Sequence, residues 1–260
     1  MPFEKHLYLI LHPNEALVAS QLTPEEFGRH YAVGSPRHFS GKVIFAEVDI
    51  NFRHMYLDID DLLAQTEKEG GRVPKRTKFI SSYRVLERVE LSKLKDLYLV
   101  TVDGKVLGIQ GTREYPPEPP SKLGCVYQEI APLHLLVASN LAPPEFGRFM
   151  TTEFKTKGAP ILFFTQVELN VDDLLHSKKY DIVSPLPNVN LGHLKESIRE
   201  LMDNPDKKTK TISLDSILPL LSYRNLHTGF WFAAGTDLIF YPLPSAAEME
   251  SKHDVWWRSA

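Results

Sequence analysis

Two stretches of this chain read almost alike, and this repeat is the strongest constraint on how it can fold. Residues 17–29 read LVASQLTPEEFGR and residues 136–148 read LVASNLAPPEFGR, so ten of thirteen positions agree at an offset of 119 residues. The same offset carries FAEVDIN at 45–51 onto FTQVELN at 164–170. Matched blocks in the same order are typical of an internal repeat. The sequence therefore predicts a tandem duplication of one unit.

Further along the chain the offset grows to 132, where KRTKFIS at 75–81 matches KKTKTIS at 207–213. The extra residues fall within 177–206. Residues 115–123 form a connector with four prolines, which exclude regular hydrogen-bonded structure and favour an extended spacer. Trp256 and Trp257 suggest that the C-terminal tail packs on the body. The expected organisation is repeat unit 1 at 1–114, a proline-rich connector at 115–123, repeat unit 2 at 124–244 and the tail at 245–260.

One unit reads as βααβαβββ, with helices early and strands late. Thr23, Pro24 and Glu26 form a helix-start signal, with an N-cap, a proline at the first helical position and a capping box. The expected elements are a strand at 7–11, a helix from Asn14 to Leu22, a helix from Pro24 to about Val33, a strand at 42–51, a helix at 58–68, a strand at 78–89 and a hairpin at 97–109. This order predicts an α+β fold with largely antiparallel sheets, arranged as a pseudo-two-fold dimer within the chain.

Composition narrows the class of protein. The formal net charge is −3, which provides no overall field to attract nucleic acid. Cys125 is the single cysteine, which excludes an intrachain disulfide and favours a reducing compartment. The sequence contains no run of 18 apolar residues, so it predicts no membrane span. We expect a soluble, cytoplasmic protein.

The repeated block carries a charged pair in each copy, Glu26 with Arg29 and Glu145 with Arg148. Residues three apart lie on one helix face, so each pair is a candidate ligand-binding pair or a surface ion pair worth a few tenths of a kcal/mol. A helical glycine costs about 1 kcal/mol relative to alanine. Gly28 in copy one and its counterpart in copy two therefore favour close packing, and with it the structural interpretation.

Histidines gather in the first copy, which suggests a site there that the second copy lacks. His12 and His30 correspond to Ala131 and Phe149 at the offset of 119. Together with two carboxylates of one strand they form the candidate catalytic set of a hydrolase-like enzyme with one active half. The spacings of familiar zinc sites are missing, so no metal ligands are predicted. The candidate set is His12, His30, Glu47 and Asp49.

Two basic blocks, one in each copy, are candidate anion-binding sites. The alternative is a solvated strand edge on which lysines prevent wrong pairing. The candidate residues are Lys75, Arg76, Lys207 and Lys208.

No phosphate-binding glycine loop and no nucleophile motif occurs, so the cofactor, if there is one, is unknown. Clefts between domains are common binding sites. The first functional hypothesis is a binding or interaction module that takes a small ligand or a protein partner at the seam between the repeats. The alternatives are the hydrolase-like enzyme and binding of anions or nucleic acid through the basic blocks.

Overall fold

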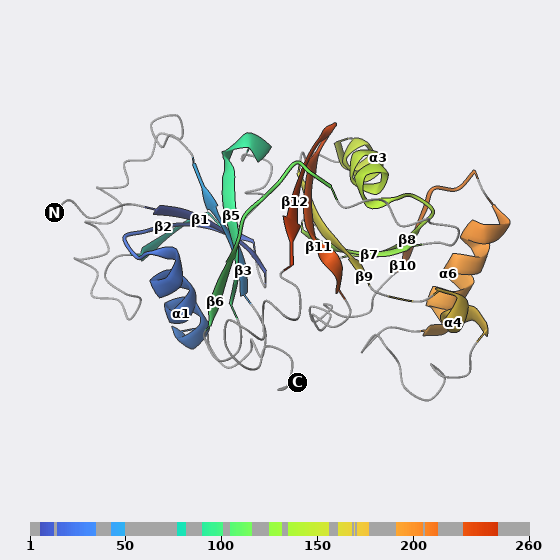
Figure 1. Cartoon of the computed structure of the whole chain (residues 1–260), viewed down its shortest axis with the longest axis horizontal. Coiled ribbons are helices and arrows are strands. Elements are labelled where there is room, and N and C mark those ends of the chain that lie inside the picture. Colours follow the sequence, from blue (N-terminus) through green and yellow to red (C-terminus); the bar gives the residue numbers. More distant parts are fainter. Residues whose placement is uncertain are drawn as a thin grey trace. The chain divides into compact units, whose positions relative to one another are not determined.

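The structure is a computed structural model, and its contacts divide the chain into two units, Met1–Gly111 and Thr112–Ala260. Figure 1 shows their elements. Each unit is described by itself. The structure describes residues 6–12, 15–34, 43–49, 77–81, 90–100, 105–115, 125–131, 135–155, 161–167, 169, 171–176, 191–204, 206–212 and 226–243.

Unit 1 is built on a six-stranded antiparallel sheet with strand order β4-β2-β1-β3-β5-β6. Helix α1 (Pro24–Gly34) contacts β3, β5 and β6. A 3₁₀ turn at Leu91–Lys93 leads into β5. The strands are β1 (His6–His12), β2 (Ala16–Ser20), β3 (Val43–Val48), β4 (Thr77–Ser81), β5 (Leu94–Val100) and β6 (Val106–Ile109).

Unit 2 carries a second six-stranded antiparallel sheet, with order β10-β8-β7-β9-β11-β12. Its strands are β7 (Cys125–Ala131), β8 (Leu136–Ser139), β9 (Leu162–Val167), β10 (Thr209–Ile212), β11 (Leu226–Ala234) and β12 (Asp237–Pro242). Its helices are α3 (Pro143–Lys155), α4 (Val171–His176) and α6 (Leu191–Asp203). Two antiparallel sheets and few helices confirm the α+β class.

The helix expected from Asn14 to Leu22 is wrong. Residues Ala16–Ser20 form strand β2, which pairs with both β1 and β4. All five residues are buried, as expected for an inner strand that is covered on both faces. The described part of unit 1 therefore begins with two strands and one helix.

Other expected elements are confirmed where they lie within the described residues. The strand at 7–11, the helix from Pro24 and the core of the strand at 42–51 occur as β1, α1 and β3. The capping box is also present, because Thr23 N donates to Glu26 Oε2 at 3.0 Å and Glu26 N donates to Thr23 Oγ1 at 3.4 Å. The helix expected at 58–68, the residues 82–89, the turn at 101–104 and the tail at 245–260 lie outside the described residues.

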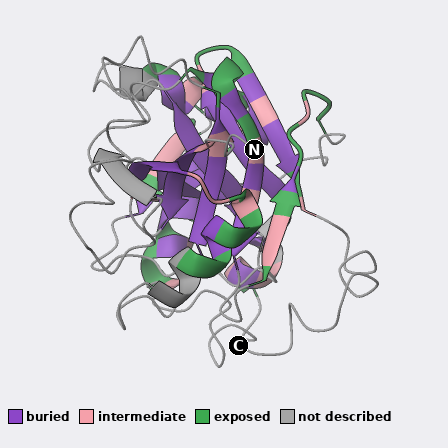
Figure 2. Ribbon diagram, turned by 90° about the vertical axis from the view of Figure 1, so that its left-hand side faces the viewer, coloured by how far each residue is buried: buried purple, intermediate pink, exposed green. Residues whose placement is uncertain are grey.

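An aromatic cluster joins the helix to the sheet in unit 1. Tyr8 stacks on Phe27 with ring centroids 4.3 Å apart, and Phe45 meets both rings edge-on at 5.3 and 5.0 Å. The Tyr8 hydroxyl donates to the carbonyl of Leu22 at 2.7 Å. These three rings are almost fully buried, and Figure 2 shows the strands around them mostly in the buried colour.

Unit 2 contains the same arrangement. Tyr127 stacks on Phe146 at 4.0 Å, and Phe164 meets them edge-on at 5.8 and 5.0 Å. The Tyr127 hydroxyl donates to the carbonyl of Leu141 at 2.7 Å. Each of these residues lies 119 positions after its counterpart in unit 1.

The helical glycines of the repeated block lie against the sheet. A Cβ on Gly28 would lie 2.7 Å from a methyl of Val106, and one on Gly147 would lie 3.0 Å from Ala233. A side chain at either position would force its neighbours to shift, so both positions favour glycine. This agrees with the close packing expected from the sequence.

Candidate functional site

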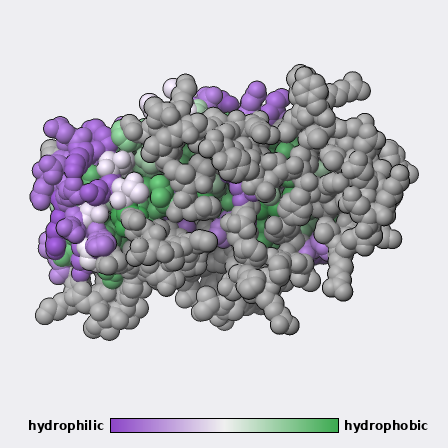
Figure 3. All heavy atoms as spheres, turned by 180° about the vertical axis from the view of Figure 1, so that it is seen from behind, coloured by the Kyte–Doolittle hydropathy of each residue, from purple (hydrophilic) through white to green (hydrophobic). Residues whose placement is uncertain are grey.

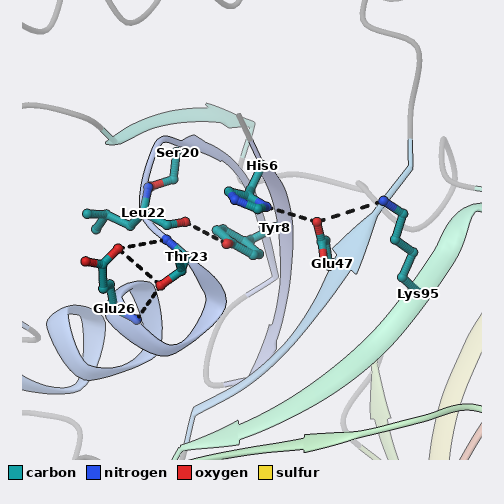
Figure 4. Close-up of polar contacts among 8 residues, drawn as sticks. All are labelled: His6, Tyr8, Ser20, Leu22, Thr23, Glu26, Glu47 and Lys95. Carbon is teal, nitrogen blue, oxygen red and sulfur yellow. Dashed lines mark hydrogen bonds and ion pairs between the residues drawn. The ribbon is translucent and has the colours of Figure 1, made fainter. Parts of the chain in front are cut away.

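The polar cluster that stands out in unit 1 joins β1, β3 and β5 (Figure 4). His6 Nδ1 lies 3.0 Å from Glu47 Oε1, and Lys95 Nζ lies 3.9 Å from the same oxygen. The His6 and Glu47 side chains are only 10% and 18% exposed, whereas Lys95 is 51% exposed. We call these three residues the rim cluster.

The sheet positions the rim cluster. His6 is the first residue of β1 and its ring stacks on Tyr8 with centroids 5.7 Å apart. Tyr8 lies opposite Glu47 in the register of β1 and β3. The aromatic core thus fixes the plane of the imidazole and directs its Nδ1 edge at the carboxylate.

The hydrogen bond determines the chemistry of the ring. An ionised carboxylate only accepts, so the hydrogen of the short contact belongs to His6 Nδ1. Nε2 of the neutral ring is then an acceptor. That atom is buried and has no hydrogen-bond partner among the residues that the structure describes. An unpaired buried polar atom costs about 1–3 kcal/mol, which a bound group can recover.

Two further ionisable groups on β5 respond to the cluster. Partial burial raises the pKa of Asp96, the Glu47 carboxylate raises it further and Lys95 opposes this. Burial, followed by the negative charges of Asp96 and Glu47, raises the pKa of Tyr98 to about 12. This part of unit 1 therefore concentrates negative charge beside the His6–Glu47 pair.

The equivalent positions of unit 2 are not ionisable in the same way. The offset of 119 puts Cys125 in place of His6 and Gln166 in place of Glu47, and Gln166 Nε2 lies 3.6 Å from Cys125 Sγ. Burial raises the pKa of the Cys125 thiol, and a hydrogen bond with Tyr127 opposes this. Leu97 lies opposite Ala46 and Phe230 lies opposite the equivalent Thr165, and the residues directly before them are Asp96 in unit 1 and Gly229 in unit 2.

The candidate catalytic residues lie at different places in unit 1. His12 is buried and lies opposite Ile44, whereas Glu47 lies opposite Tyr8, three residues farther along β3, which is about 10 Å. His30 is exposed on α1, and Asp49 is exposed, with its backbone N–H donating to Lys93 O at 2.7 Å. Of the four, Glu47 is the one that the structure puts in the rim cluster.

The charged residues of the repeated block lie on exposed helix surface. Arg29 pairs with Glu25, four residues before it, and Glu26 closes the capping box. Glu145 and Arg148 are exposed on α3. These contacts fit helix-stabilising roles.

The basic block of unit 2 is partly neutralised. Lys207 and Lys210 both pair with Glu200 of α6, the second at 2.8 Å, and together they lower the pKa of Glu200 to about 2. Lys208 is exposed, and its carbonyl accepts from Ser139 Oγ at 2.9 Å. Figure 3 shows hydrophilic side chains gathered at this end of unit 2. Lys75 and Arg76 lie outside the described residues.

The sequence predicted Glu47 as a candidate residue, but neither His6 nor Lys95. His6 counted only as one of several histidines near the start of the chain. Two changes at the same offset carried the signal, because His6 and Glu47 become Cys125 and Gln166. A paired change at two positions 41 residues apart indicates that their side chains touch.

Within the described ranges, no three His, Cys, Asp or Glu side chains gather as a metal site, and no helix is long and apolar enough to cross a membrane. The chain matches no protein-family model, no curated protein and no solved structure.

Proposed function

We propose that the chain is a non-enzymatic binding module made of two copies of one α+β unit, and that the first copy holds the ligand. The observation that carries this proposal is the His6 imidazole, which is nine-tenths buried and is held by Glu47 at Nδ1, with no described partner at Nε2. A ligand that donates to this atom would recover the cost of its burial.

The duplication is supported by sequence and packing together. The offset of 119 relates the aromatic clusters, the tyrosine hydroxyl bonds and the glycines at the helix–sheet contact. Both sheets also arrange their strands in the same order of position. Two copies with one framework allow one copy to specialise while the other serves as a scaffold.

The chemistry of the rim cluster suggests the class of ligand. Nε2 of a neutral His6 accepts a hydrogen bond, which favours a hydroxyl or an amine on the ligand. Lys95 is half exposed and carries a positive charge close to Glu47. We therefore propose a small hydroxylated anion, such as a hydroxy acid or a sugar phosphate, whose hydroxyl meets His6 and whose negative group meets Lys95.

A thermal-shift screen of the whole chain against small hydroxylated anions tests this function. A ligand at about 100 times its Kd stabilises by roughly 2.7 kcal/mol, which is a shift of several degrees. We expect His6→Ala and Glu47→Gln to abolish the shift and the matched variant Cys125→Ser in unit 2 to retain it. A flat screen, or a shift that survives His6→Ala, contradicts the proposal.

The same pair favours a second candidate function. A carboxylate that holds Nδ1 of a histidine leaves Nε2 as a general base, as hydrolases require. We expect a hydrolase to turn over an activated ester and to lose turnover in His6→Ala, whereas a binding module shows the thermal shift without turnover.

A further inference from the structure

The outer edge of β12 in unit 2 is covered by a short extended segment. Thr112 N donates to Phe240 O at 2.7 Å, and Phe240 N donates to Thr112 O at 2.8 Å. Three residues later, the Tyr115 ring lies 5.3 Å from the Trp231 ring and its hydroxyl donates to the carbonyl of Leu238 at 3.2 Å. A backbone pair and an aromatic anchor thus attach residues 112–115 to this edge.

The registers of the two sheets identify the same edge in unit 1. Phe164 lies opposite Trp231, and Trp231 lies opposite Phe240. In unit 1, Phe45 lies opposite Tyr98, and Tyr98 lies opposite Gly108. Tyr98 and Gly108 of unit 1 therefore correspond to Trp231 and Phe240 of unit 2. The same comparison matches Val106 with Leu238 and Lys105 with Asp237.

Among the residues that the structure describes, no strand pairs with the outer edge of β6 in unit 1. β6 is the last strand in the sheet order, Gly108 is exposed, and Val106 and Leu107 are half-buried. Backbone groups of an antiparallel strand alternate in direction. The N–H and C=O of Gly108 therefore point away from β5, as those of Phe240 point away from β11.

The sequence of β6 does not protect this edge. Edge strands commonly carry lysine or proline, which discourages pairing with another chain. The edge strand β10 of unit 2 contains Lys210, and the β12 edge is covered by Thr112. By contrast, β6 reads VLGI, with neither lysine nor proline. Such an edge is suited to receiving an extended strand.

We propose that β6 binds an extended peptide of another protein in the same way that β12 binds residues 112–115. One peptide residue pairs with the backbone of Gly108, and an aromatic side chain three residues later stacks on Tyr98. Gly108 lacks a side chain where Phe240 places its ring 4.5 Å from Trp231. A Cβ on Gly108 would lie 3.2 Å from the Tyr98 ring, so that ring lies against the Gly108 backbone and no side chain at position 108 covers it. The proposal does not depend on the ligand of the rim cluster.

Charge at this edge refines the peptide. Unit 1 has the exposed Lys105 where unit 2 has the exposed Asp237. The segment on β12 reads Thr112-Arg113-Glu114-Tyr115. A positive side chain at this end of β6, where unit 2 has a negative one, favours a peptide with more acidic side chains overall. We therefore expect a peptide of the pattern Thr-Glu-Glu-Tyr to bind β6 more tightly than Thr-Arg-Glu-Tyr.

The test titrates the whole chain with a capped, fluorescent peptide Gly-Thr-Glu-Glu-Tyr-Pro and measures anisotropy. Gly108→Pro removes the outward N–H, and proline is tolerated on the open side of an edge strand. We expect this variant to weaken binding at least tenfold. Two changed peptides leave the protein intact: N-methylation of the threonine and replacement of the tyrosine by alanine should each weaken binding by a similar factor.

Four results would overturn the proposal. The first is no binding at millimolar peptide, and the second is binding that Gly108→Pro leaves unchanged. The third is a concentration-dependent dimer that is lost in Gly108→Pro, which would assign the edge to a second copy of the chain. The fourth is binding only after deletion of residues 245–260, which would assign the edge to the chain's own tail.

Discussion

The two units agree in their aromatic cores and differ at the rim. Tyr8, Phe27 and Phe45 of unit 1 meet at 4.3–5.3 Å, and their counterparts in unit 2 meet at 4.0–5.8 Å. Two residues along the strands from Tyr8 and Phe45, unit 1 has the ionisable pair His6 and Glu47, and unit 2 has the uncharged pair Cys125 and Gln166 in their place. The same framework therefore carries an ionisable pair in one unit and an uncharged pair in the other.

This difference separates residues that build the framework from residues that are free to specialise. The aromatic rings and the helical glycines, which agree between the units, are packed inside, whereas His6 and Glu47, which differ, lie towards the ends of their strands. Changes at a rim do not require the core to repack, because the aromatic rings beneath stay in place.

The largest test of the shared framework is a side chain at the helical glycines. Gly28→Val and Gly147→Val should each destabilise by about 3 kcal/mol through overpacking. The two costs should be similar, because each added side chain would meet fully buried neighbours, Val100 and Phe45 at Gly28 and Ala233 and Phe164 at Gly147. Hydrogen exchange at β1 and β7 measures the loss unit by unit.

Arg148→Ala serves as the control, because this residue is exposed one position from Gly147. It should change exchange at β7 little. If either glycine variant were instead as stable as the unchanged chain or more stable, as helix propensity alone would predict, the close packing of helix on sheet would be contradicted.

A smaller effect is expected at the tyrosine hydroxyls. Tyr8→Phe and Tyr127→Phe each leave a carbonyl, that of Leu22 or Leu141, without its donor at 2.7 Å. The loss should be about 1 kcal/mol in each unit. Chemical denaturation followed with hydrogen exchange at each unit gives the two values. A cost confined to one unit would break the equivalence of the two cores.

Local signals predicted much of the fold. Thr23, Pro24 and Glu26 identified the start of α1 because capping acts between residues three apart in sequence. The period-2 pattern of 43–48 identified β3 for a similar reason. Strand β2 was mistaken for a helix, because a five-residue run that is apolar on both faces has no period, and only its pairing with β1 and β4 makes it a strand.

The candidate site was harder to predict, because it depends on pairing between distant residues. Glu47 was selected from the sequence, but its partner His6 lies 41 residues earlier and meets it only through the register of β1 with β3. For Arg29, the sequence predicted an ion pair with Glu26, three residues earlier, but its partner in the structure is Glu25, four residues earlier. Helix spacing allows both partners, and only side-chain positions decide between them.

The smallest effect is expected from the charge beside the rim cluster, and it sharpens the contrast with Gly229 of unit 2. Because the pKa of Asp96 is raised in the folded protein, its ionised form opposes folding at neutral pH. Asp96→Asn should therefore raise Tm slightly at pH 7. The gain should disappear as pH falls below the ordinary aspartate pKa of 3.8, where the carboxyl is protonated in both states. Scanning calorimetry between pH 3 and 8 measures this change in Tm, with Asp237→Asn on the exposed end of β12 as a control for loss of one charge.

A lower Tm for Asp96→Asn at pH 7 would contradict this prediction. It would mean that Asp96 stabilises the cluster through Lys95, and that unit 1 maintains its rim cluster by charge pairing.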